Sequence, residues 1–227
     1  MPTESELVWE FFGRRPEGFF VEVGANDPRN GSQTWFLESQ GWNGILVEPL
    51  ARFYAALSAA RPQSRVVQAA CSAPGHPPTT EFFVGEDSRH SSLRRNVFDA
   101  DTRYAQTETV RLLTLDELLA EAGHPRLDFV SIDVEGLQLE VLRGFDLARH
   151  QPRLLFVEDH LLNWDTHFHL RRRGYRLVKR TELNNWYVPE GTPFHLTTPS
   201  ERLKLWRKLW PGTPARWLKA WLRQTRS

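Results

Sequence analysis

A chain of 227 residues with 40% hydrophobic residues, 25% charged residues and a net charge of +1 has the length and composition of one globular domain. Its one cysteine, Cys71, excludes an intrachain disulfide, and the acidic first twenty residues predict no signal peptide. No apolar stretch approaches the roughly 18 residues that a membrane-spanning helix needs, so we expect a soluble, cytoplasmic domain.

Strand and helix signals alternate along the chain. Capping boxes at Thr3/Glu6 and Thr114/Glu117 each predict the start of a helix. In chain order we expect a helix ending at residue 12, a strand over 19–24, a helix over 32–39, a strand over 44–48, a helix over 50–60, strands over 65–70, 81–84 and 107–113, a helix over 115–122, a strand over 127–133, a helix over 137–142, a strand over 154–158, a helix over 166–173, and strands over 175–180 and 186–188.

Four of these strands, FFVEVG, GILVEP, DFVSID and LLFVED, are mostly apolar rather than alternating. Such runs are typical of parallel strands covered by helices on both faces, and their alternation with helices predicts an α/β fold with a doubly wound, mostly parallel sheet flanked by helices. Ligands of such sheets lie outside the carboxyl ends of the strands. The polar residues expected at or near that edge are Glu22, Gly24, Glu48, Cys71, Ser72, Asp133, Glu135, Glu158 and Asp159.

The loop after the first strand indicates the kind of ligand. Gly24 is followed by no second glycine before Gly31, so the dinucleotide pattern G-x-G-x-x-G is missing, and no P-loop motif exists in the chain. An acidic residue in the strand, Glu22, suits a cationic amino group or a ribose better than a pyrophosphate. Glu48 is placed to accept hydrogen bonds from two vicinal ribose hydroxyls. A cationic adenosine ligand without phosphates, S-adenosylmethionine, fits both; alternatively, both carboxylates are solvated strand ends.

Three segments, FFVEVGANDP, GWNGILVEP and DFVSIDVEGLQLEVLRGF, resemble the FkbM-type S-adenosylmethionine-dependent methyltransferases. The resemblance covers roughly residues 18–190 and implies the Rossmann-like fold of the class I methyltransferases. We therefore expect a methyltransferase domain over 1–197 and a basic, Trp-rich tail over 198–227.

The resemblance also implies roles for individual residues. It implies that Gly24, Ala25 and Asn26 hold the methionine part of the cofactor and that Glu48 holds the ribose. Asp133 and Glu135 would line the reacting side of the pocket, which makes both of them candidate cofactor-binding residues. The chain departs from many members after the asparagine, because Asp27, Pro28 and Arg29 precede Gly31 and lengthen the loop.

Methyl transfer to a hydroxyl needs orientation of the two reacting atoms and removal of a proton. Asp133, Glu158 and Asp159 end two strands that we expect to be neighbours, and three carboxylates so close call for a cation, raised pKa values or separation. Mg²⁺ bound by these three residues, with a further oxygen from Asn184 or Asn185, is one interpretation.

In the other interpretation no metal is present. Asp133 then binds the amino group of the cofactor, and Glu135 interacts with the first turn of the next helix. Asp133, Asp159 and His160 are the candidate catalytic residues, with His160 as the metal-free base unless that histidine is structural. Cys71 and Ser72 follow the third strand, where adenine contacts backbone groups; otherwise Cys71 is a small buried thiol.

The polar segment between the strands expected at 81–84 and 107–113 predicts a long surface loop or a lid. As a lid it would bring Ser91, Ser92, Arg94 and Arg95 over the site, where an arginine would recognise an anionic group of the acceptor. The alternative is an ordinary solvated loop.

The last 28 residues carry eight basic side chains and one acidic side chain, hence +7, which leaves the rest of the chain at −6. Four of the nine tryptophans also lie here: Trp206, Trp210, Trp217 and Trp221. Two helices are expected, from Thr198 and from Thr213, each with an apolar and a basic face. The pattern predicts either binding to the inner face of a membrane or to a membrane-bound partner, or packing on the domain or on a second copy in a homodimer. Nucleic acid is not an expected partner.

These observations together predict an O-methyltransferase that uses S-adenosylmethionine, with or without Mg²⁺. The expected acceptor is a hydroxyl of a small molecule, sugar or glycan, including a lipid-linked glycan if the tail binds a membrane. Two alternatives stay open: a module that binds the adenosyl ligand without turnover, and a methyltransferase for a non-sugar acceptor. The missing glycines disfavour a nicotinamide oxidoreductase.

Overall fold

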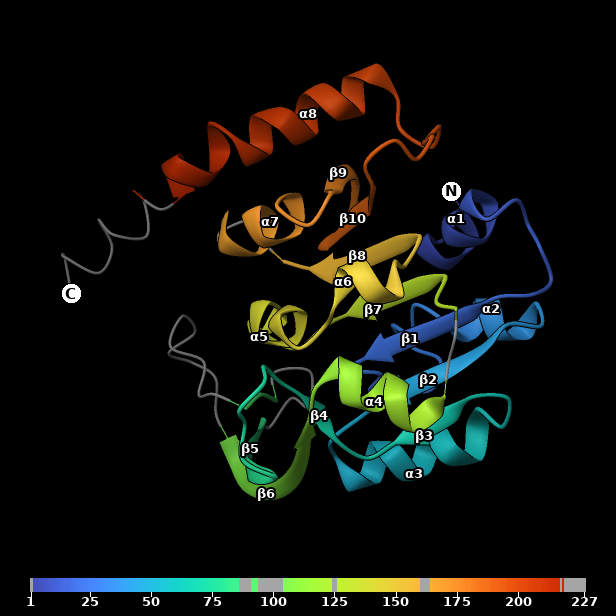
Figure 1. Ribbon diagram of the computed structural model, residues 1–227, viewed down its shortest axis with the longest axis vertical. Helices are drawn as coiled ribbons and strands as arrows, with labels where there is room; N and C mark the ends of the chain where they lie inside the picture. Colours follow the sequence, from blue (N-terminus) through green and yellow to red (C-terminus); the bar gives the residue numbers. More distant parts are fainter. Residues whose placement is uncertain are drawn as a thin grey trace.

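The computed structural model describes residues 2–85, 91–93, 104–123, 126–159, 164–216 and 218. A seven-stranded sheet with the order β3-β2-β1-β7-β8-β10-β9 forms its centre (Figure 1). The five strands from β3 to β8 are parallel, and β10 runs antiparallel to both neighbours. Its strands are β1 (Phe19–Val23), β2 (Asn43–Val47), β3 (Arg65–Val67), β7 (Phe129–Ile132), β8 (Leu154–Glu158), β9 (Tyr175–Thr181) and β10 (Asn184–Pro189).

A smaller sheet lies beside the carboxyl end of β3. It has the order β4-β6-β5, in which β4 is parallel and β5 antiparallel to β6. These strands are β4 (Ala70–Cys71), β5 (Thr79–Gly85) and β6 (Tyr104–Leu113).

Helices cover both faces of the main sheet, and α4 and α6 lie in front of it in Figure 1. Their bounds are α1 (Glu4–Phe11), α2 (Trp35–Ser39), α3 (Ala51–Ala60), α4 (Leu115–Ala122), α5 (Gln138–Arg143), α6 (Leu147–His150), α7 (Trp164–Arg171) and α8 (Pro199–Leu209). One core cluster joins the sheet to α4, α5, α6 and α7, and a second joins it to α1, α2 and α3.

Successive residues of a strand point to opposite faces of the sheet, and in β1 both faces are buried. Val21 and Val23 belong to the first core cluster and Phe20 to the second. The apolar runs of the sequence are therefore explained by two buried faces, and the predicted doubly wound, mostly parallel sheet is confirmed.

Most of the predicted elements are present, and the differences have local causes. Residues 32–34 are not helical, because they bind the carboxylate of Glu22. The strand expected over 65–70 is two strands, since β4 leaves the main sheet to pair with β6. The short helix α6 was not expected. Both predicted capping boxes are present, at Thr3 and Thr114.

The tail helix α8 begins where its sequence predicts. The side chain of Thr198 accepts a hydrogen bond from the backbone N–H of Glu201, and Pro199 occupies the first turn. A further helical turn covers 212–216. None of the helices in the described ranges combines the length and the apolar character that crossing a bilayer requires.

Candidate active site

The register of the parallel strands fixes the geometry of the site. The last paired residues of β2, β1, β7 and β8 lie side by side in one row: Val47, Val23, Ile132 and Val157. The residues that follow them form a second row at the rim of the sheet: Glu48, Gly24, Asp133 and Glu158. Because neighbouring strands are about 4.8 Å apart, the row from β2 to β8 spans about 14 Å.

Gly24 allows the first loop to cross this rim. Its φ is +85°, and a Cβ at this position would lie 1.8 Å from the backbone oxygen of Asp133. The backbone N–H groups of Gly24 and Ala25 both donate to the carbonyl of Val47. The loop therefore passes directly over the ends of β2 and β7, where no larger residue fits.

The carboxylate of Glu48 binds the backbone of the next turn of this loop. Its Oε2 accepts from the backbone N–H of Asn26 at 2.9 Å, and its Oε1 accepts from that of Leu50 at 2.9 Å. Asn26 has a φ of +49°, in the left-handed region, at the point where the loop turns over the carboxylate. Burial raises the pKa of Glu48 from 4.5 to about 7, against the two N–H donors and nearby Arg52, which lower it.

A buried polar network fixes the outer half of the same loop. The carboxylate of Glu22 accepts from the backbone N–H of Gln33 and from the hydroxyls of Ser32 and Thr34. Burial raises the pKa of Glu22, while these donors and the charge of Arg61 lower it.

Arg61 is the cation of this network and is 0% exposed. Its Nε donates to Glu38 at 2.7 Å, and its two terminal nitrogens donate to Thr34 at 2.9 Å, to Ser32 at 3.2 Å and to the carbonyl of Pro28 at 3.2 Å. One guanidinium thus connects two buried carboxylates to the loop.

Three carboxylates meet at the β7–β8 end of the rim. Asp133, Glu135 and Glu158 each place one oxygen within 4.8 Å of the others. Asp133 is an exposed member of the cluster, but it lies in the cavity among protein atoms that displace water. This desolvation, followed by a hydrogen bond and repulsion from Glu158 and then by the charge of Glu135, raises the pKa of Asp133 above its ordinary value. Glu135 has a φ of +46°, in the left-handed region, and lines the cavity.

A cavity of about 550 Å³ covers the whole row. Its β3–β4 side is apolar and includes Cys71, whose pKa burial raises to about 12, so the thiol stays neutral. The other large apolar residues on its walls are Leu50, Phe53, Phe82, Leu93, Leu137 and Leu183. The cavity therefore has an apolar region near β4, a single carboxylate at Glu48 and an acidic cluster at β7–β8.

The structure brings most of the predicted site residues to this cavity. The lining includes Gly24, Ala25, Asn26, Glu48, Cys71, Asp133, Glu135 and Glu158. Glu22 and Ser72 are not in the lining: Glu22 lies beneath the loop, and the N–H of Ser72 donates to the carbonyl of Leu113.

Asp159 also lies away from the cavity lining. Its backbone carbonyl accepts from Arg180 and Asn185, and the acidic cluster contains Glu135 in its place. Asn184 donates to Glu4, so neither asparagine points into the cavity. His160, Arg94 and Arg95 lie outside the described residues.

Several cavity residues had no clear signal in the sequence. Asn30 and Gly31 line it because Asp27 Oδ1 accepts from the N–H groups of Arg29 and Asn30 and folds the longer loop inward. This turn could have been predicted from Asp27, because an aspartate side chain often accepts from the backbone N–H two residues later.

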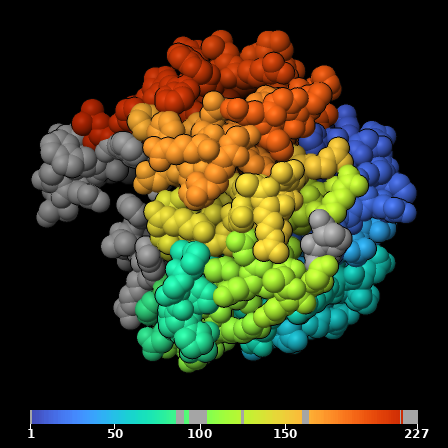
Figure 2. All heavy atoms as spheres, in the orientation of Figure 1, coloured from blue at the N-terminus to red at the C-terminus, as the bar shows by residue number. Residues whose placement is uncertain are grey.

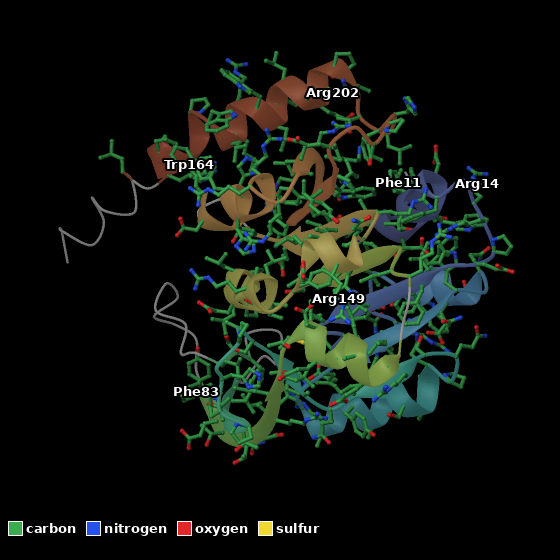
Figure 3. All side chains as sticks on the ribbon, in the orientation of Figure 1. Phe11, Arg14, Phe83, Arg149, Trp164 and Arg202 are labelled. Atoms are coloured by element: carbon green, nitrogen blue, oxygen red, sulfur yellow. The ribbon has the colours of Figure 1, made fainter. Side chains whose placement is uncertain are left out.

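The described part of the expected lid reaches the cavity as well. Ser91 and Leu93 line it, and the backbone of Ser92 pairs with Phe83 of β5, which Figure 3 labels. The side chain of Ser92 donates to the carbonyl of Glu135. This segment therefore joins the second sheet to the acidic cluster.

The fold and the rim define a doubly wound α/β protein with a ligand cavity at the carboxyl ends of its strands. The family model "Methyltransferase FkbM domain" matches residues 22–177, which is more than half of the chain. The chain therefore belongs to the FkbM methyltransferase domain family, and the resemblance seen in the sequence is confirmed.

Three solved structures with some similarity to this chain are named as methyltransferases. FkbM from Methylobacillus flagellatus KT is 15% identical with a TM-score of 0.49, and the match covers 76% of this chain but 44% of that one. Precorrin-6y C5,15-methyltransferase from Geobacter metallireducens GS-15 is 11% identical, with a TM-score of 0.44 and coverage of 81% and 86%. The METTL16 methyltransferase domain is 12% identical, with a TM-score of 0.44 and coverage of 82% and 68%. No curated protein matches the chain.

Replacing Arg61 tests the buried network. We expect Arg61→Met to lower the free energy of unfolding by about 3–5 kcal/mol, because Glu38 and Glu22 would stay buried without their cation. Arg65→Met is the matched control: Arg65 forms an exposed pair with Glu121, so a loss of at most about 1 kcal/mol is expected. Urea denaturation of both variants measures the difference, and equal losses would contradict the role of Arg61.

Replacing Gly24 tests the close approach at the rim. Gly24→Ala should destabilise the protein by several kcal/mol, roughly threefold more than a left-handed φ alone costs, because the added methyl group meets a backbone oxygen. Gly75→Ala is the control, since Gly75 has a φ of +82° and a Cβ added there would have no neighbour within 4 Å. Thermal and urea unfolding of the pair would contradict the close approach if both variants lost the same stability.

Proposed function

We propose that this chain is an O-methyltransferase that uses S-adenosylmethionine and that its acceptor is a sugar or glycan hydroxyl. The observation that carries the proposal is the rim row, in which a single carboxylate at Glu48 and an acidic cluster at Asp133 lie on opposite sides of the Gly24 loop in one cavity. Membership of the FkbM family supports methyl transfer.

The residues present fit the adenosyl cofactor. The apolar region near Cys71 and Phe53 suits an adenine ring, and Glu48 is the next group along the row, where a ribose would offer two hydroxyl donors. The loop at Gly24–Asn26 and the acidic cluster follow, and negative charge there would attract an amino group and a sulfonium. When bound, the cofactor supplies an electrophilic methyl group.

The remaining chemistry belongs to the chain. Asp133 has a raised pKa and lies in the acidic cluster, so its ionised form is a stronger proton acceptor than an ordinary aspartate. Glu158 and Glu135 orient the acceptor by accepting hydrogen bonds from hydroxyls next to the reacting one. Leu93 and Leu137, two apolar residues of the cavity wall, limit the access of water.

The acidic cluster also bears on the acceptor class. Carboxylates repel an anionic acceptor, whereas the neighbouring hydroxyls of a sugar can each donate a hydrogen bond to one of them. A neutral, polyhydroxylated acceptor therefore complements this end of the cavity. A protein that binds cofactor but methylates no hydroxyl would be the binding module that the sequence left open.

Mg²⁺ is a second component of the proposal. Three carboxylate oxygens within 4.8 Å of one another form a donor set that suits a hard divalent cation with bound waters. The residues that would hold it are Asp133, Glu135 and Glu158. Such an ion would stabilise the ionised cluster and lower the pKa of an acceptor alcohol.

Ligand-induced stabilisation tests the cofactor. At about 100 times its dissociation constant, S-adenosylhomocysteine should add about 2.7 kcal/mol to the free energy of unfolding, whereas NAD should add nothing. Thermal unfolding with each ligand measures this. No response to S-adenosylmethionine or S-adenosylhomocysteine at millimolar concentration would overturn the proposal.

The titration of Glu48 gives a pH test. Its pKa is higher in the folded protein than the ordinary 4.5, so the ionised group destabilises the ligand-free fold, and stability falls as the pH rises from about 4.5 to about 7. This fall should be about 1–3 kcal/mol larger than in Glu48→Gln.

Affinity for S-adenosylhomocysteine should change in the opposite direction. It should rise between pH 6 and 8, in about the range where Glu48 ionises and becomes a better acceptor for ribose hydroxyls. Glu48→Gln should bind roughly 10–100-fold more weakly and show a flatter profile, while Glu81→Gln, an exposed residue of β5, should behave as wild type. Calorimetric titrations in which both variants kept the wild-type profile would contradict the role of Glu48.

Replacing Asp133 separates chemistry from binding. Asp133→Asn should keep S-adenosylhomocysteine affinity within about tenfold, because Glu135 and Glu158 still attract the amino group, and should lower kcat by about a hundredfold or more, because the cluster loses its proton acceptor. Glu140→Gln, on α5 outside the cavity, is the control. The measurement is transfer of labelled methyl groups to a panel of methyl glycosides, with and without Mg²⁺. Binding without transfer to any acceptor in the wild type would favour the binding module.

A further inference from the structure

The tail helix α8 has two faces with different surroundings. Its inner face packs on the domain: Leu209 is 5% exposed, and the indole N–H of Trp164 donates to the carbonyl of Leu209 at 3.2 Å. Near its start, Glu201 pairs with Lys179 of β9 at 3.3 Å. Figure 3 labels Trp164 below the carboxyl end of α8 and Arg202 on its first half. The helix is thus fixed in orientation.

The outer side of α8 carries large apolar side chains that are widely exposed, although one face of Trp210 packs on Trp164 and Phe168 of α7. Leu203 and Trp206 are each 56% exposed and Trp210 is 40% exposed. Their spacing of three and four residues puts them on one face of a helix. Among the described residues, the exposed large hydrophobic side chains are concentrated here, and Leu218 in the next turn is 58% exposed. Figure 2 shows α8 at the outer edge of the molecule.

Basic side chains flank this apolar face. Lys204 and Arg207 are exposed, and Trp206 and Trp210 also line a groove of about 380 Å³ whose walls include Arg171, Arg176 and Arg202. The last 28 residues have a net charge of +7, although the rest of the chain is acidic. Tryptophan beside an apolar surface and a ring of cations is the composition of helices that lie in the headgroup region of anionic bilayers.

We propose that the outer face of α8 binds an anionic lipid surface and holds the methyltransferase domain on the membrane. Leu203, Trp206 and Trp210 would enter the headgroup region, and the flanking cations would contact lipid phosphates. In Figure 1 the carboxyl end of α8 lies on the side at which β1, β7 and β8 end, so the cavity rim is on the same side of the domain as that end of the helix. This proposal goes beyond the proposed function and does not depend on it.

Charge distinguishes the lipid surface from two other occupants. A second copy docked on the same face would bring the Lys204 and Arg207 side chains of both copies together, and like charges oppose that contact. Nucleic acid would use the cations but leave the exposed leucine and tryptophan surface without a partner. An anionic lipid surface complements both the charge and the apolar side chains.

Co-flotation of the full chain with vesicles tests the proposal. The protein should float with vesicles of equal parts phosphatidylglycerol and phosphatidylcholine and remain behind with phosphatidylcholine alone, and about 1 M salt should weaken the binding. Leu203→Ser with Trp206→Ser should weaken binding at least about tenfold by removing buried apolar area. Arg207→Glu should weaken it by about tenfold or more.

Arg149→Glu is the matched control, because it makes the same charge change on the exposed surface of α6, away from α8 (Figure 3). It should change binding less than about threefold. All variants should keep the wild-type melting temperature and its shift with S-adenosylhomocysteine, which shows that the domain is folded.

Three results would overturn the proposal. The first is no flotation with the anionic vesicles. The second is an equal loss of binding in Arg149→Glu and Arg207→Glu, which would indicate a general charge effect. The third is a concentration-dependent dimer in analytical ultracentrifugation that Trp206→Ser abolishes while vesicle binding is absent, since the face would then bind a second copy.

Discussion

The site depends on one buried cation. Arg61, the residue that follows α3, pairs with Glu38 and donates hydrogen bonds to the hydroxyls that bind the carboxylate of Glu22. A buried carboxylate without a cation or donors is costly, so the network is stable only as a complete set. It fixes residues 28–34, and the inner half of the same loop crosses the rim at Gly24. The shape of the cavity therefore depends on a buried ion-pair network that lies outside the cavity.

The parallel register of the strands sets the order of chemical groups along the pocket. Each strand contributes one residue past its last paired position, so the order of strands in the sheet becomes the order of chemical groups along the cavity. The apolar wall follows β3, Glu48 follows β2, and the acidic cluster follows β7 and β8. Two of these carboxylates have raised pKa values, and desolvation is the largest cause at both. Backbone N–H donors oppose it at Glu48, whereas neighbouring negative charge adds to it at Asp133.

Much of this arrangement could be predicted from the sequence. Apolar runs and capping boxes define the main elements, and strand ends define the rim, because both depend on neighbouring residues in the chain. The role of Glu22 could not be predicted, since its partners lie ten to twelve residues away and replace the start of the expected helix. The acidic cluster contains Glu135 and not Asp159, and the backbone at Glu135 passes through the left-handed region. That turn has no signal in residue type alone.

The central claim is that the loop after β1, the end of β2 and the end of β7 form one ligand site. Hydrogen–deuterium exchange with and without S-adenosylhomocysteine tests it directly, because the amide hydrogens of all three segments are read in one experiment. We expect slower exchange at residues 24–34, 48–50 and 133–137 together, with β9 and β10 unchanged. Protection confined to other segments, or to only one of these three, would contradict the claim.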